Sequence, residues 1–95
     1  MTAALSNCLY KASQRANGEL NRAYNDVETR LNAAGRERLI RTQRLWLRYR
    51  ESNCAAEREL YVPGTAAQPV YLACLESMTR ARIKDLQITY AVRLK

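Results

Sequence analysis

The stretch CAAERELYVPGTAAQPVYLAC, residues 54–74, decides the fold because it turns the chain back on itself between two cysteines. Pro63 withdraws a backbone donor and Gly64 tolerates positive φ, so this pair predicts the break within the longest loop, Tyr61 to Pro69. Cys54 lies ten residues before Gly64 and Cys74 lies ten residues after it. With helices on both sides of the loop, the two cysteines would lie at the same height in a hairpin.

Both cysteines also project from the faces that the two helices turn toward each other, so a bridge is geometrically plausible. A disulfide closing a loop of this length contributes about 3 kcal/mol, largely by restricting the unfolded chain. The alternative is a pair of buried free thiols, which pack as small apolar groups. The spacing favours the bridge, and with it an oxidising compartment.

Outward from this hairpin, apolar residues recur at the three-and-four spacing of a helical face. The spacing predicts helices at about 4–32, 36–60 and 70–93. In the first, the apolar face collects Leu5, Leu9, Ala12, Ala16, Leu20, Ala23, Tyr24, Val27 and Leu31. In the second, the inner face collects Leu39, Gln43, Trp46, Leu47, Arg50 and Cys54. In the third, one side collects Tyr71, Leu75, Met78, Arg82, Leu86 and Thr89.

Three long helices with short connections pack as antiparallel neighbours, because each apolar stripe can be buried only against another stripe. The sequence therefore predicts an all-α, antiparallel three-helix bundle with a disulfide-stapled second hairpin, as a single domain over residues 1–95. We expect Asn32–Gly35 to end the first helix, and Gly18 to mark a local bend or a close helix contact.

Sixteen Lys and Arg against nine Asp and Glu give a net charge of +7, which favours anionic partners. No window approaches the roughly 20 apolar residues that span a bilayer. The start of the chain lacks the basic and apolar regions of a secretory signal. The protein is therefore expected either to stay inside the cell or to have lost a leader, and the cysteines favour the second.

The residue inventory argues against enzymatic chemistry. Without any His the chain cannot build Ser-His-Asp or Cys-His machinery, and three scattered Cys do not match a zinc site. Gly-rich phosphate loops are missing too. Glu57 and Glu59, or Asp26 and Glu28, could converge, but such carboxylates on a helix are usually solvated. We therefore expect no catalytic residue, no metal and no cofactor.

Polar residues on the inner faces stand out. Arg50 and Arg82 are costly to bury unless they are paired, so each needs a partner. Counting about Gly64 puts Arg82 level with Trp46, which suggests cation-π stacking, with Asp85 or Glu19 as carboxylate partner. A structural network that fixes helix register is favoured over a ligand site. The expected members are Asn21, Tyr24, Gln43, Trp46, Arg50, Thr79 and Arg82.

A basic stripe lies on the outer face of the second helix. Arg41, Arg44 and Arg48 share one face through their spacing of three and four residues, and they make a ridge that could take phosphate or carboxylate groups. The alternative is a solvated basic exterior. Tyr49 lies beside the stripe, but nucleic-acid-binding proteins usually have more aromatic residues among their basic ones, or a recognisable module.

The inner-face residues resemble a known family. The runs are Glu19-Leu20-Asn21-x-x-Tyr24, Leu39-x-x-x-Gln43-x-x-Trp46-x-x-x-Arg50-x-x-x-Cys54 and Cys74-x-x-x-x-Thr79-x-x-Arg82-x-x-x-Leu86. In order and over nearly the whole chain, they are similar to the LprI-like domain of small secreted bacterial proteins. The resemblance implies an envelope-located helical domain with a Cys54–Cys74 bridge and, for at least the namesake member, inhibition of lysozyme.

Some positions depart from that family. Asn17 stands where the family tends to carry Asp, and Glu51 follows Arg50 where Asp is usual. A further Cys expected upstream of Cys8 is not present, which would leave Cys8 unpaired and able to link two chains. Val62-Pro63-Gly64-Thr65 replaces a Gly-Gly-Ser. The resemblance transfers fold and compartment better than activity.

Two functions remain open, together with a third that requires reduced thiols. The first is a periplasmic or secreted inhibitor of lysozyme or a related peptidoglycan hydrolase, docking through Tyr61, Thr65 and Gln68. Because many lysozymes are basic, such docking would need a local acidic patch, for which Glu57, Glu59 and Glu76 are candidates. The second is an envelope module that binds an anionic polymer through Arg41, Arg44 and Arg48. The third is a cytoplasmic helical regulator.

Overall fold

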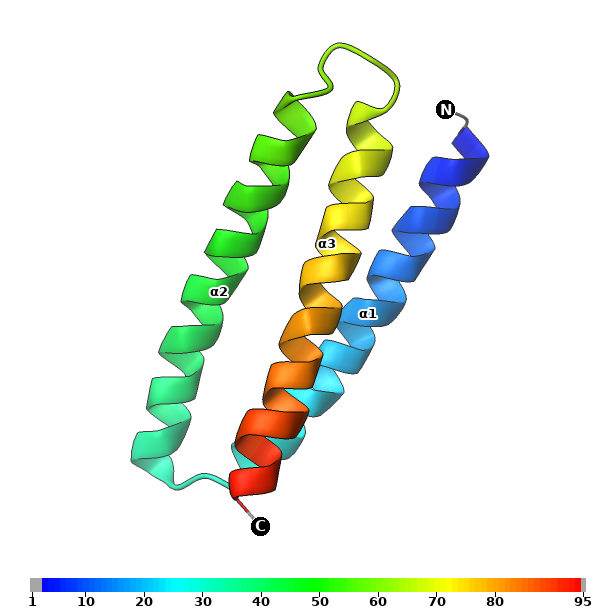
Figure 1. The fold of residues 1–95 in the computed structure, drawn as a ribbon. Coiled ribbons are helices and arrows are strands. Elements are labelled where there is room, and N and C mark those ends of the chain that lie inside the picture. The colour runs from blue at the N-terminus through cyan, green and yellow to red at the C-terminus, as the bar shows by residue number, and fades with distance from the viewer. Residues whose placement is uncertain (1–2, 95) are drawn as a thin grey trace.

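A computed structural model describes residues 3–94 as three helical rods. These are α1 (Ala3–Thr29), α2 (Ala33–Glu59) and α3 (Ala67–Lys84), and α3 continues into a π-helical stretch, η1 (Asp85–Ala91). Consecutive helices run antiparallel, and the sulfurs of Cys54 and Cys74 are bonded across the α2–α3 hairpin (Figure 1). The predicted all-α bundle with its stapled second hairpin is confirmed.

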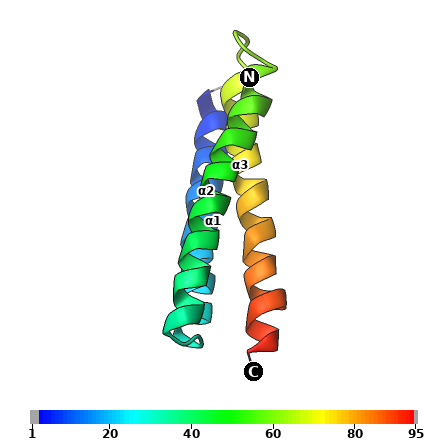
Figure 2. The ribbon, with the colours of Figure 1, turned by 90° about the vertical axis from the view of Figure 1, so that its left-hand side faces the viewer.

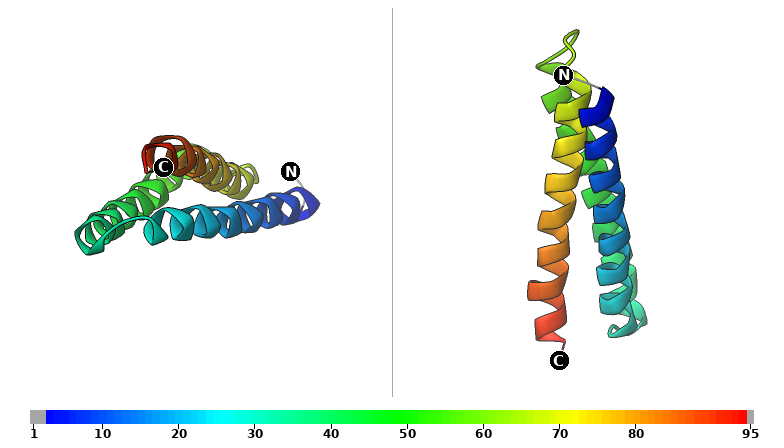
Figure 3. Two further views of the ribbon diagram at one scale, coloured as in Figure 1. Left: turned by 90° about the horizontal axis from the view of Figure 1, so that it is seen from below. Right: turned by 90° about the vertical axis from the view of Figure 1, so that its right-hand side faces the viewer.

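The third rod is the centre of the bundle. α3 packs against both α1 and α2, whereas α1 and α2 make few direct contacts with each other. The side view in Figure 2 shows α3 to one side of the other two rods, and the end view in Figure 3 shows α1 and α2 diverging from their connection. The result is a long, narrow molecule of 47 × 21 × 16 Å.

The core lies in the half of the bundle next to the α1–α2 connection. Its buried members are Leu20, Ala23, Val27, Leu39, Ile83 and Leu86, with Tyr24, Leu31, Trp46, Tyr90, Ala91 and Leu94 partly buried against them. Burial of such side chains is the main stabilising contribution to a helical bundle. The other half, toward the α2–α3 loop, has the disulfide in place of a second large cluster.

The first connection was predicted three residues too late. α1 ends at Thr29, and Asn32 caps the N-terminus of α2: its side-chain Oδ1 accepts a hydrogen bond from Gly35 N at 2.8 Å. Asn is among the best N-capping residues, so Asn32 marks the start of α2 and not the end of α1. Gly35 therefore lies in the first turn of α2, where an added Cβ would come within 3.2 Å of Leu31.

An added Cβ at Gly18 would lie 3.7 Å from Arg22 of the same helix, so the close contact with a neighbouring helix expected there is absent. The alternative of a local bend at Gly18 stays a prediction. Thr89 is exposed, although the three-and-four spacing placed it on the inner side of the third helix. The π-helical winding of η1 changes the residue spacing, so that Leu86 and Tyr90 face the core.

The α2–α3 loop is shorter than predicted. α3 begins at Ala67, so Gln68 and the buried Pro69 belong to its first turn and not to the loop. Proline is tolerated there, because the first backbone N–H groups of a helix have no partner within the helix. None of the helices in residues 3–94 combines the length and apolar character that a bilayer crossing requires.

Candidate functional site

Three consecutive apolar side chains project from the start of the α2–α3 loop. Leu60 is 81% exposed, Tyr61 48% and Val62 51%, and we call these three residues the loop tip. A tight turn follows, in which Gly64 N donates to Tyr61 O at 2.7 Å. The sequence prediction named Tyr61 and missed its two apolar neighbours, although three apolar residues beside a Pro-Gly break were a usable signal.

The Cys54–Cys74 disulfide clamps the helices below the loop tip. Its Cα atoms are 5.5 Å apart, within the usual range for a disulfide, and both residues are buried. The pairing predicted from equal distances to Gly64 is confirmed. The bridge holds the two helix ends together, which limits how far the loop tip can move.

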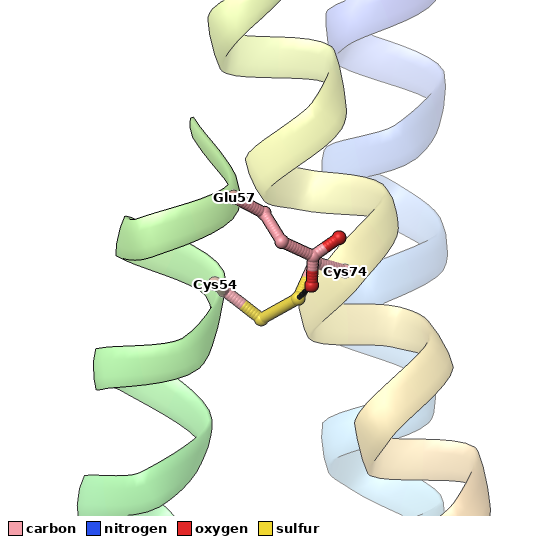
Figure 4. Close-up of side chains that lie close together, drawn as sticks. All are labelled: Cys54, Glu57 and Cys74. Atoms are coloured by element: carbon pink, nitrogen blue, oxygen red, sulfur yellow. Dashed lines mark hydrogen bonds between the residues drawn. A yellow bond between two sulfur atoms is a disulfide. The ribbon is translucent and has the colours of Figure 1, made fainter. Parts of the chain in front are cut away.

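The carboxylate of Glu57 lies against this disulfide, as Figure 4 shows. Its Oε2 is 2.9 Å from Cys74 Sγ and accepts a hydrogen bond from Asn53 Nδ2 at 3.0 Å. Cys54, Glu57 and Cys74 bring three potential metal-ligand atoms within 4.8 Å of one another. The two bonded sulfurs are not thiolates and are poor metal ligands. While the bridge is in place, Glu57 therefore offers the one good metal-ligand atom of these three.

Tyr71 of α3 contacts α2 near the disulfide, at the loop end of the hairpin. Its hydroxyl donates to Glu51 Oε2 at 2.6 Å, and the Arg58 guanidinium lies 4.4 Å from the centre of its ring. The hydrogen bond to Glu51, followed by partial burial, raises the pKa of the Tyr71 hydroxyl. α2 and α3 are thus joined below the loop by a covalent bond, a hydrogen bond and a cation-π contact.

Arg50 is buried at the level where all three helices meet. Its Nη1 donates to Thr79 Oγ1 of α3 at 2.9 Å and to Asn17 Oδ1 of α1 at 3.0 Å. The guanidinium also lies 5.1 Å from the centre of the Trp46 ring, one turn earlier on α2. These contacts join the helices through neutral acceptors, and Asn17 was not among the predicted members.

Arg82 makes different contacts from those predicted. Its Nε donates to Gln43 Oε1 at 3.0 Å, and its guanidinium lies 5.8 Å from the centre of the Tyr90 ring. The expected stacking of Arg82 on Trp46 was wrong, because Arg50 lies over the Trp46 ring and Arg82 lies over Tyr90. Neither expected carboxylate partner pairs with Arg82: within residues 3–94 no ion pair joins Arg82 to Asp85, and Glu19 binds Arg80 at 2.6 Å.

The two network members predicted on α1 have separate surroundings. Tyr24 packs against the core cluster, and burial, with Glu28 nearby, raises the pKa of its hydroxyl. Asn21 is exposed, and its side chain makes no hydrogen bond with another residue in 3–94. Asn21 therefore lies outside the buried polar contacts.

A groove between α1 and the third rod was not predicted from the sequence. It encloses about 310 Å³, with an apolar floor and a charged rim. Its lining is Glu19, Arg22, Ala23, Asp26, Val27, Ile83, Leu86, Gln87 and Ala91. Next to it Arg80 binds both Glu19 and Glu76, which compensates one carboxylate of the expected acidic patch.

The predicted binding residues fall into two separate groups. Tyr61, Thr65 and Gln68 are exposed at the loop end of the hairpin. Arg41, Arg44 and Arg48, which we call the arginine ridge, are exposed along the middle of α2. Cys8 is exposed and unpaired within the residues that the structure describes.

The comparison with protein families decides the assignment. Residues 1–86 match the family described as lysozyme inhibitor LprI. The chain belongs to the LprI lysozyme inhibitor family. Neither the curated proteins nor the solved structures give a match to it. Within this LprI chain, the disulfide, the Arg50–Thr79 hydrogen bond and the Arg82–Gln43 hydrogen bond connect helices, and Trp46 packs against the core cluster. The loop tip and the arginine ridge face outward.

Proposed function

We propose that this chain is a periplasmic or secreted inhibitor of lysozyme or a related peptidoglycan hydrolase, and that the loop tip enters the enzyme's substrate cleft. The observation that carries the proposal is the exposed trio Leu60, Tyr61 and Val62 at the end of a clamped hairpin, in a chain of the LprI family. Binding energy in protein interfaces concentrates in a few such anchors, with aromatic residues prominent among them. The proposed role is binding, with no catalytic step by this chain.

Rigidity supports the loop tip as the contact element. A segment that is ordered before binding loses less conformational entropy on association. The disulfide, the Tyr71–Glu51 hydrogen bond and the turn at Gly64 all restrict the loop end of the hairpin. A disulfide is also typical of oxidising compartments, which supports the periplasmic or secreted location.

Charge shapes the kinetics expected for this complex. The chain carries +7, and many lysozymes are basic, so the two proteins repel each other at long range. The proposed contact itself is apolar. Of the three carboxylates in the expected acidic patch, Glu76 is paired with Arg80, whereas Glu57 and Glu59 form no salt bridge within residues 3–94. Added salt should therefore speed association, because it screens the repulsion.

The test is inhibition of a purified lysozyme acting on a soluble oligosaccharide, which avoids binding of this basic chain to cell-wall polymers. Tyr61→Ala should raise the inhibition constant by about 30-fold, the loss typical of an interface anchor. Tyr49→Ala is the matched control, because Tyr49 is also an exposed tyrosine of the same hairpin but lies on the outer face of α2. It should leave inhibition unchanged.

Two results would contradict the proposal. One is that the wild-type chain fails to inhibit a panel of lysozymes and related hydrolases. The other is that Tyr61→Ala and Leu60→Ser leave inhibition intact, which would place the contact elsewhere on the surface. Circular dichroism of each variant checks that the helices are unchanged.

A further inference from the structure

The arginine ridge carries positive charge that the rest of the fold does not compensate. Arg41, Arg44 and Arg48 are exposed, and none forms a salt bridge with a residue in the described part of the chain. By contrast, Arg30, directly after α1, and Arg80 on α3 are paired with carboxylates. The ridge is therefore open to an external anion.

An apolar side chain lies among these charges. Leu45 is 63% exposed, and with the three arginines it lines a shallow recess of about 210 Å³. Tyr49, one turn later on α2, is 62% exposed. Arginine stems are themselves apolar and can lie along an apolar surface while the guanidinium reaches polar groups. The ridge thus has an apolar floor beneath three cationic groups.

This combination distinguishes between anionic ligands. A free phosphate or a nucleic-acid backbone would be held by the guanidinium groups, but it would gain nothing from an exposed leucine. A layer of anionic phospholipid offers both parts, since its phosphates accept hydrogen bonds from arginine and its acyl region accepts apolar side chains. We propose that the arginine ridge binds an anionic phospholipid surface, with Leu45 and Tyr49 entering the headgroup region.

The position of the ridge suits a surface-bound protein. It lies on the face of α2 that points away from α3, the helix that α2 packs against. The loop tip is at the far end of α2, so the chain could hold a lipid surface without covering the tip. The proposal does not rest on inhibition of lysozyme, because vesicle binding is measured without any enzyme.

The experiment is co-sedimentation of the full chain with vesicles at a fixed, low ionic strength. We expect binding to vesicles that contain phosphatidylglycerol and little binding to pure phosphatidylcholine. Replacing Arg41, Arg44 and Arg48 together with Gln should weaken binding by about a hundredfold, because each arginine near an anionic membrane contributes about a factor of five. The matched control replaces Arg15, Arg22 and Arg93, which are also exposed and unpaired in residues 3–94, and should weaken binding by less than about fivefold, the screened effect of net charge alone.

A second pair of variants tests the apolar part. Leu45→Ser should weaken vesicle binding several-fold, whereas Ile88→Ser, at a position with similar exposure on η1, should not. Circular dichroism confirms the helix content of every variant. Agreement of both the arginine and the leucine arms with these expectations supports the proposal.

Four outcomes would overturn it. The first is absence of binding to the anionic vesicles. The second is equal loss in the two arginine sets, which would mean that net charge alone attracts the chain. The third is release by inorganic phosphate at constant ionic strength, which would indicate a site for the free anion. The fourth is tighter binding to duplex DNA with no effect of Leu45→Ser, which would indicate polymer phosphates in place of lipid.

Discussion

Arg50 is a buried cation, and both of its short hydrogen bonds go to neutral acceptors. The carboxylate of Glu51 is 3.9 Å from its Nη2 and is itself more than half exposed. The Nε of Arg50 has no hydrogen-bond partner in the described residues. A buried cation whose short hydrogen bonds go only to neutral groups is less stabilised than one that also donates a short bond to a carboxylate.

Asn17→Asp should therefore raise stability. The new carboxylate would replace a neutral amide oxygen 3.0 Å from Arg50 Nη1, and we expect about 1 kcal/mol more free energy of unfolding at pH 7. Urea denaturation measures the change. Asn21→Asp adds the same charge at an exposed position on the same helix and should change stability by less than about 0.5 kcal/mol. An equal gain in both variants would mean that reduced net charge, and not the contact with Arg50, is responsible.

Tyr71 should make the stability of the hairpin sensitive to alkaline pH. Its pKa is raised above the ordinary value of 10.0 by the hydrogen bond to Glu51, so the folded state holds the proton more tightly than the unfolded chain. The contribution is fully present below pH 10 and is lost as the pH rises further. Melting temperatures from pH 9 to 11 should fall less for Tyr71→Phe than for the wild type. The control Tyr49→Phe, which removes an exposed hydroxyl, should behave as the wild type does.

At the scale of elements, the α2–α3 hairpin depends on its covalent clamp. The buried hydrophobic cluster lies in the other half of the bundle, so the loop half has fewer apolar contacts to hold it. The double variant Cys54→Ser and Cys74→Ser should lose about 3 kcal/mol of unfolding free energy, as expected for a loop of 20 residues. Chemical denaturation under non-reducing conditions measures this. A loss below about 1 kcal/mol would show that Tyr71 and the packing of α3 hold the hairpin without the bridge.

The elements also show where helix periodicity is a reliable guide. Leu20, Ala23, Val27 and Leu39 are buried as their spacing predicts. The spacing predicted a buried Thr89 wrongly, because the π-helical winding of η1 depends on packing that the sequence pattern does not reveal. It also misplaced the first connection, where a single capping hydrogen bond from Gly35 to Asn32 decides the start of α2.

For the whole molecule, stability is divided between two ends held by different forces. The end near the α1–α2 connection depends on apolar packing, and the loop end depends on the disulfide and polar contacts. Hydrogen exchange should therefore show faster amide exchange at 54–59 and 67–74 after reduction, with residues 20–27 still protected. A uniform increase along the chain would mean that the molecule opens as one cooperative unit.

Local periodicity, a Pro-Gly break and equal distances along the chain were enough to predict the helical class and the hairpin and to favour the cysteine pairing. The same periodicity separated the outward arginines from the inner face. The folded structure was needed to show which groups hydrogen-bond to Arg50 and Arg82, that Leu60 and Val62 join Tyr61 at the surface, and that Arg80 pairs with Glu19. Long side chains can choose among several partners at nearly the same height, and that choice depends on distances in three dimensions.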